Sequence, residues 1–338
     1  MAPENSLSDE APGLTPALPA HNPKRSRIQL MKATFSLLSF LFLGLVPARS
    51  EVQPVKHLID THIHLYDTTR ERKVGWPPAN DKVLYKPHLP PEYNKLAKAA
   101  GVTGVVIVEA SDRLEDNKWV LDLVKGDQFY IGLVGNVDVY REDFDDHVAR
   151  LAKDRRFVGV RARGSKPIDF SHDLVLANLN MLAQRNLTMD YLTNGGGIPG
   201  IQTADKLARS IPGLTIVIDH CLGYDFDGRN PRGDWVAAVE SLAANKNVYC
   251  KISGLYQRCT DQPAVKDPDH YRTVLDVLWK NFGAGRLIYG SNWPCTKHSG
   301  SYASFLTLVD SWISPKGQKA REAYYWKNAA TAYRLPLK

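Results

Sequence analysis

Residues 57–64 read HLIDTHIH, an apolar run that ends in two histidines one residue apart. Successive side chains of an extended strand alternate between faces, so His62 and His64 are predicted to project to one side, about 7 Å apart. Two neutral imidazoles on one face can share a divalent ion, zinc or manganese, if a third ligand and an open position for water are supplied elsewhere. Two polar residues at a strand end explain the pair equally well until that ligand is found.

After residue 50, short β-rich runs alternate with longer helical runs. The predicted strands are 58–62, 104–109, 130–136, 158–161, 187–192, 214–219, 248–253 and 286–289. The predicted helices are 92–100, 116–125, 142–153, 172–185, 201–210, 234–245, 269–282, 302–313 and 318–333. Eight strand–helix units in sequence predict an α/β fold with a parallel sheet, and eight is the number that closes a (β/α)₈ TIM barrel. We therefore expect residues 51–338 to form one barrel domain.

The first fifty residues do not continue this pattern. Residues 1–30 carry several prolines and a basic cluster but little apolar periodicity, so we expect a disordered or non-native extension. Residues 31–50 combine a basic start, an apolar run at 33–46 and a small-residue cleavage site after Ser50, which is typical of a secretory signal peptide. The run is short for a membrane span. A periplasmic or secreted protein without stable membrane association is expected, and an uncleaved membrane anchor is the alternative.

Composition and charge narrow the range of partners. The 338-residue chain is 43% hydrophobic and carries a formal net charge of +7, which is ordinary for a globular domain with a sizeable core. No run of lysines and arginines in the body of the chain indicates a nucleic-acid groove. The expected partner is a small-molecule substrate, and the sequence does not determine the oligomeric state.

Four cysteines lie in the second half of the chain: Cys221, Cys250, Cys259 and Cys295. In an oxidising compartment one or two disulfides could form among them. Cys250 stands within an apolar strand and is expected to be a small core residue. The other three fall in or near loops and are the expected bridge partners.

Polar residues end nearly every predicted strand. In order they are His62, His64, Glu109, Arg161, Arg163, Asp190, Asp219, His220, Lys251, Ser253, Ser291 and Asn292. The active site of a TIM barrel lies at these carboxyl ends, and a purely structural barrel does not need polar residues there. Their convergence predicts a polar catalytic site. The long connection 66–91 starts at the same end, and its tryptophan and proline turns around Trp76 predict an ordered cover over the barrel mouth.

Seven short motifs in this order resemble the amidohydrolase superfamily, in particular its branch of sugar-lactone and pyrone-dicarboxylate lactonases. They are DTHIH at 60–64, VEAS at 108–111, GVR at 159–161, DH at 219–220, KISGL at 251–255, YGSNWP at 289–294 and NA at 328–329. The resemblance extends over residues 56–335. It implies a TIM barrel that hydrolyses a lactone or related ester, with His62, His64 and His220 in the metal-binding or carbonyl-polarising positions.

The resemblance also implies an aspartate where this chain has Asn292. An amide can donate or accept a hydrogen bond, but it cannot act as the base that takes the proton of the attacking water. Proton transfer is therefore expected to fall to Glu109, or to Asp190 if that side chain points inward. His220 and Asn292 complete the expected catalytic set.

The expected substrate-binding residues are Trp76, Arg161, Lys251, Ser253 and Trp293. Arginine and lysine would pair with a carboxylate or hydroxyls of the substrate, and the two tryptophans would offer surfaces for a sugar ring. These residues also have structural explanations. Glu109 and Lys251 could form a salt bridge across the barrel, and Asp190 could be a satisfied polar group of the core.

Two other functions stay open because of Asn292. The superfamily includes metal-dependent decarboxylases, which would be expected to keep the aspartate of strand eight as a metal ligand. A catalytically weakened, carbohydrate-binding pseudoenzyme would tolerate the amide. We expect a hydrolase, since a group of ionisable residues in a cleft is more often catalytic.

Overall fold

The computed structural model describes residues 53–72, 74–163, 168–169, 172–193 and 197–337. The predicted extension and signal peptide lie outside the described residues. None of the helices in the described part of the chain is both long and apolar enough to span a bilayer.

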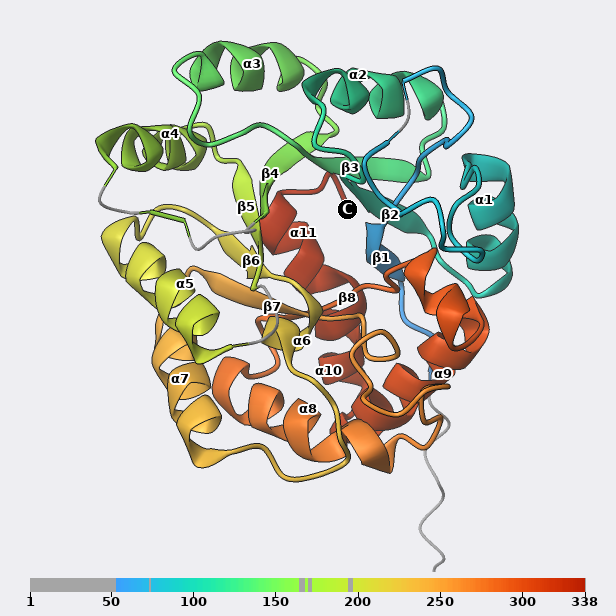
Figure 1. Cartoon of the computed structure of the whole chain (residues 1–338). Helices are drawn as coiled ribbons and strands as arrows, with labels where there is room; N and C mark the ends of the chain where they lie inside the picture. Colours follow the sequence, from blue (N-terminus) through green and yellow to red (C-terminus); the bar gives the residue numbers. More distant parts are fainter. Residues whose placement is uncertain (1–52, 73, 164–167, 170–171, 194–196, 338) are drawn as a thin grey trace, which may run out of the picture. The chain divides into compact units, whose positions relative to one another are not determined.

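Eight parallel strands form a nearly closed barrel, in which each strand pairs with the next in sequence (Figure 1). The strands are β1 (Ile59–Ile63), β2 (Gly104–Val108), β3 (Tyr130–Gly135), β4 (Phe157–Arg163), β5 (Thr188–Leu192), β6 (Ile216–Ile218), β7 (Val248–Ile252) and β8 (Leu287–Tyr289). The chain beyond β8 meets β1 again: Asn292 N donates to His62 O at 2.8 Å, and His64 N donates to Trp293 O at 2.8 Å. The predicted ring of eight parallel strands is confirmed to this extent.

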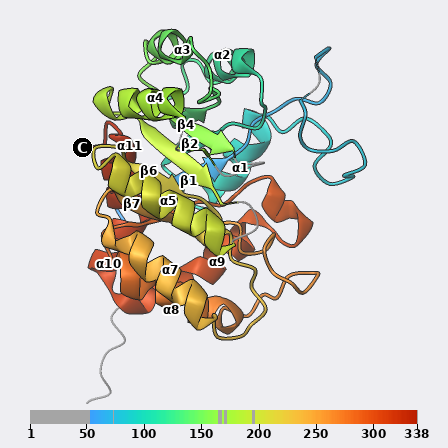
Figure 2. The same ribbon diagram turned by 60° about the vertical axis from the view of Figure 1, so that its left-hand side comes forward.

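Helices surround the strands (Figures 1 and 2). They are α1 (Pro90–Ala99), α2 (Leu114–Leu123), α3 (Phe144–Leu151), α4 (Asp173–Gln184), α5 (Ile198–Ser210), α6 (His220–Gly223), α7 (Gly233–Ala244), α8 (Asp269–Phe282), α9 (Tyr302–Ile313), α10 (Gln318–Glu322) and α11 (Asn328–Tyr333). Shorter segments are η2 (Cys295–His298), η3 (Ser314–Lys316) and the π-helical η4 (Ala323–Lys327). The apolar spacing is helical, as in α8, which buries one stripe of side chains: Tyr271, Val274, Leu275, Leu278 and Phe282.

The predicted final helix 318–333 is three consecutive segments, α10, η4 and α11. Its middle turn is π-helical and holds the adjacent Tyr324 and Tyr325, each only 1% exposed. A regular helix turns neighbouring side chains about 100° apart, so the wider π turn allows both rings to pack inward. Both rings lie against Tyr289 of β8.

A bulge in β1 directs the histidines into the barrel. The register of β1 against β2 shifts between Asp60 and Ile63. Ile59 belongs to the apolar cluster inside the barrel, whereas Ile63 belongs to the larger cluster between strands and helices. Strict alternation would place both on one side, so the bulge reverses the faces and turns His62 inward.

The C-terminal helix α11 closes one end of the barrel. Its Ala329, Ala332 and Tyr333 pack with inward-facing aliphatic residues of the strands, including Val106 and Val217. In Figure 1 α11 lies behind the ring of strands. The open end of the barrel is therefore the opposite one, where the strands finish.

The long connection after β1 is held by specific contacts. Tyr66 and His88 exchange two backbone hydrogen bonds of 3.1 and 2.8 Å, and Tyr66 OH donates to Leu84 O at 3.0 Å. The ring of Trp76 packs against Tyr66 and His64, with centroids 5.5 and 5.4 Å apart. These contacts agree with the predicted ordered connection and place its tryptophan next to a strand-end histidine.

The disulfide prediction is wrong. All four cysteines are free and buried. Cys259, one of the expected bridge partners, has the imidazole of His270 as its neighbour, 3.5 Å from sulfur to Nε2. A position in or near a loop was therefore not enough to predict a disulfide, because a disulfide also needs two cysteines at the right distance and orientation.

Candidate active site

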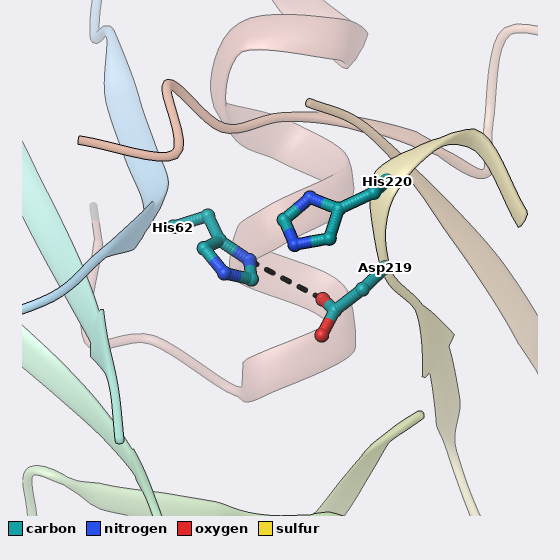
Figure 3. A group of neighbouring side chains, drawn as sticks. All are labelled: His62, Asp219 and His220. Carbon is teal, nitrogen blue, oxygen red and sulfur yellow. Dashed lines mark ion pairs between the residues drawn. The ribbon is translucent and has the colours of Figure 1, made fainter. Parts of the chain in front are cut away.

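Two histidines and an aspartate converge where β1 and β6 end. His62 stands in β1, and Asp219 and His220 follow β6 directly. One ligand atom from each lies within 4.8 Å of the others. Figure 3 shows the three side chains pointing toward one another, with His62 Nδ1 3.3 Å from an oxygen of Asp219. The structure therefore brings the predicted pair His62 and His220 together.

Asp219 is the charged centre of this group. Its carboxylate accepts a hydrogen bond from Arg161 Nε at 3.0 Å, and the ammonium of Lys251 lies 3.3 Å away. Lys251 Nζ is also 3.3 Å from His62 Nδ1. Arginine, lysine and aspartate are each at most 5% exposed. We call His62, Arg161, Asp219, His220 and Lys251 the rim cluster.

The cluster keeps its aspartate charged and its histidines neutral. Burial opposes ionisation of Asp219, but Lys251, His62 and Arg161 outweigh it and hold its pKa well below the ordinary value. Burial lowers the pKa of His62 well below 6.5 and that of His220 to about 3. Neutral imidazoles and an ionised carboxylate are the forms that bind metal ions.

His64 lies next to this group without being one of the three. Its Nδ1 is 3.1 Å from the carbonyl oxygens of both Val108 and Glu109, so this nitrogen carries the proton and donates. Nε2 is then the acceptor nitrogen of the ring. The ring centroids of His62 and His64 are 5.0 Å apart. The predicted ligand set and the observed group thus differ by one member, His64 against Asp219.

Left-handed backbone shapes two of the site residues. His220 has φ +50°, and Asn292 has φ +56°. Such conformations cost about 1–2 kcal/mol each outside glycine, and strain of this kind gathers at functional sites. Gly254 supports the turn at His220, because a Cβ there would lie 2.9 Å from the Nδ1 of that ring.

The amide of Asn292 is oriented by a neighbour. Its Nδ2 donates to Gln257 Oε1 at 3.3 Å, and its buried Oδ1 has no hydrogen-bond partner among the residues that the structure describes. Nε2 of His62 is also buried and has no partner in the described part of the chain. Buried polar atoms are normally satisfied, so unpaired atoms at a strand-end site indicate places for a ligand.

Residues 59–335 match the sequence model of a family described as amidohydrolase. The chain belongs to the amidohydrolase family. It is 32% identical over 286 residues to an L-fucono-1,5-lactonase of Burkholderia ambifaria, covering 82% of this chain and 95% of that one. An L-fucono-1,5-lactonase of Burkholderia multivorans is 26% identical over 302 residues, covering 82% of this chain and 96% of that one. Together they make this chain a hydrolase of that family, as predicted.

The fold is shared with solved structures of the family. An amidohydrolase from Burkholderia multivorans, solved with bound zinc, superposes with a TM-score of 0.75 at 23% identity. The superposition covers 83% of this chain and 100% of the other. The predicted family resemblance is confirmed.

The predicted acid–base residues of this amidohydrolase occupy different levels of the barrel. Glu109 lies beside Arg161, with 3.5 Å between Oε1 and NH1. Asp190 points inward but is fully buried: Lys251 Nζ lies 2.5 Å from it, and Tyr333 OH of α11 donates to it at 2.9 Å. Burial raises the pKa of Asp190 to about 6, against the effect of Lys251. Asp190 therefore lies between Lys251 of the rim cluster and Tyr333 of the closed end.

The other predicted binding residues differ in their burial and in their neighbours. Ser253 is buried and hydrogen-bonds with Nδ1 of His220 at 2.9 Å. Trp76 is half-buried beside His64. Trp293 is 1% exposed, and its ring packs against His88 and Tyr93. These contacts give a sugar-stacking role more support at Trp76 than at Trp293.

A pocket lies beside Glu109, with an empty volume of about 320 Å³ including open solvent. Its lining is largely apolar and comes from the connection after β1, the end of β2, α2 and β3: Leu65, Tyr66, Val74, Ala110, Trp119, Val120 and Leu133. Arg70, Arg113 and Asp116 also line it. Glu109 connects this pocket to the rim cluster through its contact with Arg161.

Sequence reasoning missed three residues of the site. Asp219 belongs to the quoted DH motif, but the sequence analysis assigned no function to it. A carboxylate at a strand end was the signal that could have identified it as a ligand. Tyr333 lies 143 positions from Asp190 and Gln257 lies 35 from Asn292. No sequence pattern indicated either of these contacts.

Proposed function

We propose that this amidohydrolase opens a sugar-derived lactone to its hydroxy acid. The observation that carries the proposal is the rim cluster, in which two neutral imidazoles and an ionised carboxylate converge under two fixed cations. The 32% identity to an L-fucono-1,5-lactonase supports a 1,5-lactone as the substrate class. The pocket beside Glu109 offers apolar walls for the substituents of the lactone ring.

The rim cluster fits a divalent ion. His62 and His220 offer nitrogens and Asp219 an oxygen within 4.8 Å of one another, and this donor set suits zinc. We propose these three residues as its ligands, with the predicted ligand His64 beside them. A divalent ion held there would polarise the lactone carbonyl and lower the pKa of a bound water. The ammonium of Lys251, 3.3 Å from two of the ligand residues, supplies fixed positive charge to the same place.

Glu109 is the proposed proton carrier. Ring opening breaks the bond between the carbonyl carbon and the ring oxygen, so water must lose a proton and the ring oxygen must gain one. A carboxylate at the pocket can accept the first proton and return it to the leaving oxygen. Arg161 holds Glu109 in place at 3.5 Å. Asp190, enclosed by Lys251 and Tyr333, positions the lysine instead.

Asn292 is the proposed hydrogen-bond acceptor for the substrate. Gln257 accepts a hydrogen bond from its amide nitrogen, and Oδ1 accepts none from the residues that the structure describes. An amide oxygen can accept from the attacking water or from a sugar hydroxyl without taking its proton. The asparagine is thus compatible with hydrolysis, provided that Glu109 is the base.

The test is a panel of sugar lactones with protein expressed from Glu51. Wild-type enzyme is expected to release acid from a 1,5-lactone, with His62→Ala and Glu109→Gln each lowering kcat by about 10²–10⁴-fold. Glu115→Gln and His57→Ala are matched controls at positions outside the site. Unchanged hydrolysis in both site variants would show that the roles are misassigned. Metal content before and after chelation, measured together with kcat, tests the proposed ion.

The same panel separates the two alternatives. Release of carbon dioxide from an aromatic acid would identify a decarboxylase, and binding of a sugar without turnover would identify a pseudoenzyme. The variant Asn292→Asp provides a further test of the pseudoenzyme alternative. A large gain in turnover from that variant would mean that the natural amide had weakened an enzyme.

We also propose that residues 31–50 direct export and that residues 51–338 are a single closed TIM-barrel domain in the periplasm or outside the cell. The support is the basic start, apolar run and small-residue site in the sequence. Expression of the full chain should yield an exported protein that begins at Glu51, and Leu41→Arg should block export. An intact N-terminus in the cytosol would contradict the proposal, and an intact N-terminus in the membrane fraction would indicate an anchor.

A further inference from the structure

A second group of metal-ligating side chains lies outside the rim cluster. Cys259, Asp261 and His270 each place one ligand atom within 4.8 Å of the others. Cys259 and Asp261 belong to the connection between β7 and α8, and His270 stands in the first turn of α8. The two groups share no residue, and only this one contains a thiol.

The spacing of this group suits zinc. A tetrahedral ion with bonds of about 2.3 Å to sulfur and about 2.0–2.1 Å to nitrogen holds the two atoms about 3.5 Å apart. Cys259 Sγ and His270 Nε2 lie 3.5 Å apart. Thiolate, imidazole and carboxylate are all established zinc ligands. The distance between sulfur and nitrogen therefore matches that of two ligands on one ion. His270 Nε2 also lies 3.4 Å from Phe226 O, a contact that a bound ion would replace.

The connection that contains Phe226 and Gly228 passes close to both Cys259 and His270. Phe226, in the connection between β6 and α7, forms a parallel bridge with Cys259. Phe226 N donates to Arg258 O at 2.7 Å, and Thr260 N donates to Phe226 O at 2.9 Å. Gly228 has φ +74°, and a Cβ there would lie 2.8 Å from His270 Nδ1. Glycine thus lets the first connection pass directly against the imidazole.

We propose that Cys259, Asp261 and His270 form a zinc site that fastens the connection after β7 to α8 and, through Phe226, to the connection after β6. Cys259 is buried, His270 is half-buried and Asp261 is exposed. The ion enters from the Asp261 side, and water completes its coordination there. Binding orders two loops that follow strands of the active-site end, so the site stabilises the framework of the barrel mouth without contributing to the chemistry.

The experiment is a titration of metal-stripped protein with Co²⁺, followed by absorbance. A cobalt–thiolate bond gives a charge-transfer band in the near ultraviolet, which the rim group of two histidines and an aspartate cannot produce. Two equivalents of Co²⁺ are expected to develop the full band in wild-type protein, where the rim cluster also takes up an ion, and one equivalent in His62→Ala, which disables the rim cluster. Addition of Zn²⁺ should bleach the band and raise Tm.

Three variants test the ligands individually. Cys259→Ser and His270→Gln should abolish the band, and the exposed Asp261→Asn should weaken Co²⁺ binding at least tenfold with the fold intact. Cys295→Ser and Asp267→Asn are the matched controls and should keep full binding. A folded wild-type protein without the band, or a band that survives Cys259→Ser, would overturn the proposal. The 3.5 Å contact would then be a thiol–imidazole hydrogen bond only.

Discussion

Two buried aspartates near opposite faces of β1 show how differently the same side chain can be used. Asp60 faces the helices, where its carboxylate accepts hydrogen bonds from Tyr93 OH at 2.8 Å, Tyr302 OH at 3.0 Å and Ser291 N at 2.8 Å. We call these four residues the tyrosine network. Asp219 faces the barrel interior, where its partners are Arg161, Lys251 and His62.

The two environments move the acidity of the carboxyl groups in opposite directions. Burial raises the pKa of Asp60, and its neutral donors only partly oppose that effect. Charged neighbours hold the pKa of Asp219 well below the ordinary value. The tyrosine network satisfies its carboxylate and ties β1 to α1, α9 and the chain after β8. The rim cluster keeps fixed charges and unpaired atoms, which is the state expected where a ligand binds.

Replacement of the rim aspartate should have the largest effect. Asp219→Asn removes the counter-charge of Arg161 and Lys251 together with an oxygen ligand, so we expect kcat for the lactone to fall on the order of 10²–10³-fold. Leaving buried cations short of a partner should also cost about 3–5 kcal/mol of unfolding free energy. Steady-state kinetics and urea unfolding measure the two losses. A variant with wild-type kcat would remove Asp219 from the site.

Acid should destabilise the metal-stripped protein through the rim histidines. The folded-state pKa of His220 is about 3 and that of His62 is also far below 6.5, so between those values the unfolded chain binds protons that the folded chain does not. The free energy of unfolding should then fall as pH drops below 6.5, by about 1.4 kcal/mol per pH unit for each imidazole.

Asp190 has the opposite effect on the pH dependence of the free energy of unfolding, over a narrower range of pH. Its pKa is raised from 3.8 to about 6, so below pH 6 the folded chain takes up a proton that the unfolded chain does not, and this offsets part of the loss. Urea unfolding at several pH values between 7.5 and 5 tests the sum. His220→Gln should reduce the slope by about one imidazole, and an unchanged slope would contradict the assignment.

The tyrosine network should give a stability effect without a kinetic one. Asp60→Asn places an amide NH₂ either against the hydroxyls of Tyr93 and Tyr302 or against the backbone N–H groups of Ser291 and His62. We therefore expect a loss of about 1–3 kcal/mol of unfolding free energy. Below the lowered Tm, kcat should stay close to wild type, because Asp60 faces away from the rim cluster. Tyr302→Phe is the milder control. Loss of turnover in a folded Asp60→Asn protein would show that the tyrosine network, like the rim cluster, is needed for catalysis.

The fold could be predicted from the sequence because its signals are local. Helices at 269–282 and 302–313 have the predicted bounds, and the strand ranges differ by at most a few residues. The site could be predicted only as a set of strand ends. Which side chains meet depends on the bulge after Asp60 and on the left-handed turn at His220, and a one-residue change of face decides whether a side chain points inward. The contact of Tyr333 with Asp190 joins the last helix to the fifth strand, and no local pattern encodes it.

That contact provides the smallest and most selective test. Tyr333 OH is a neutral donor within the charged interior, 2.9 Å from Asp190 and on the side away from the open site. Tyr333→Phe keeps the ring that packs against the strands and removes one hydrogen bond, which should cost about 0.5–1.5 kcal/mol of unfolding free energy. The lost donor should also raise the pKa of Asp190 further. If Asp190 only positions Lys251, kcat changes little; if kcat instead falls as far as in Glu109→Gln, then Asp190 is the proton acceptor and Glu109 is not.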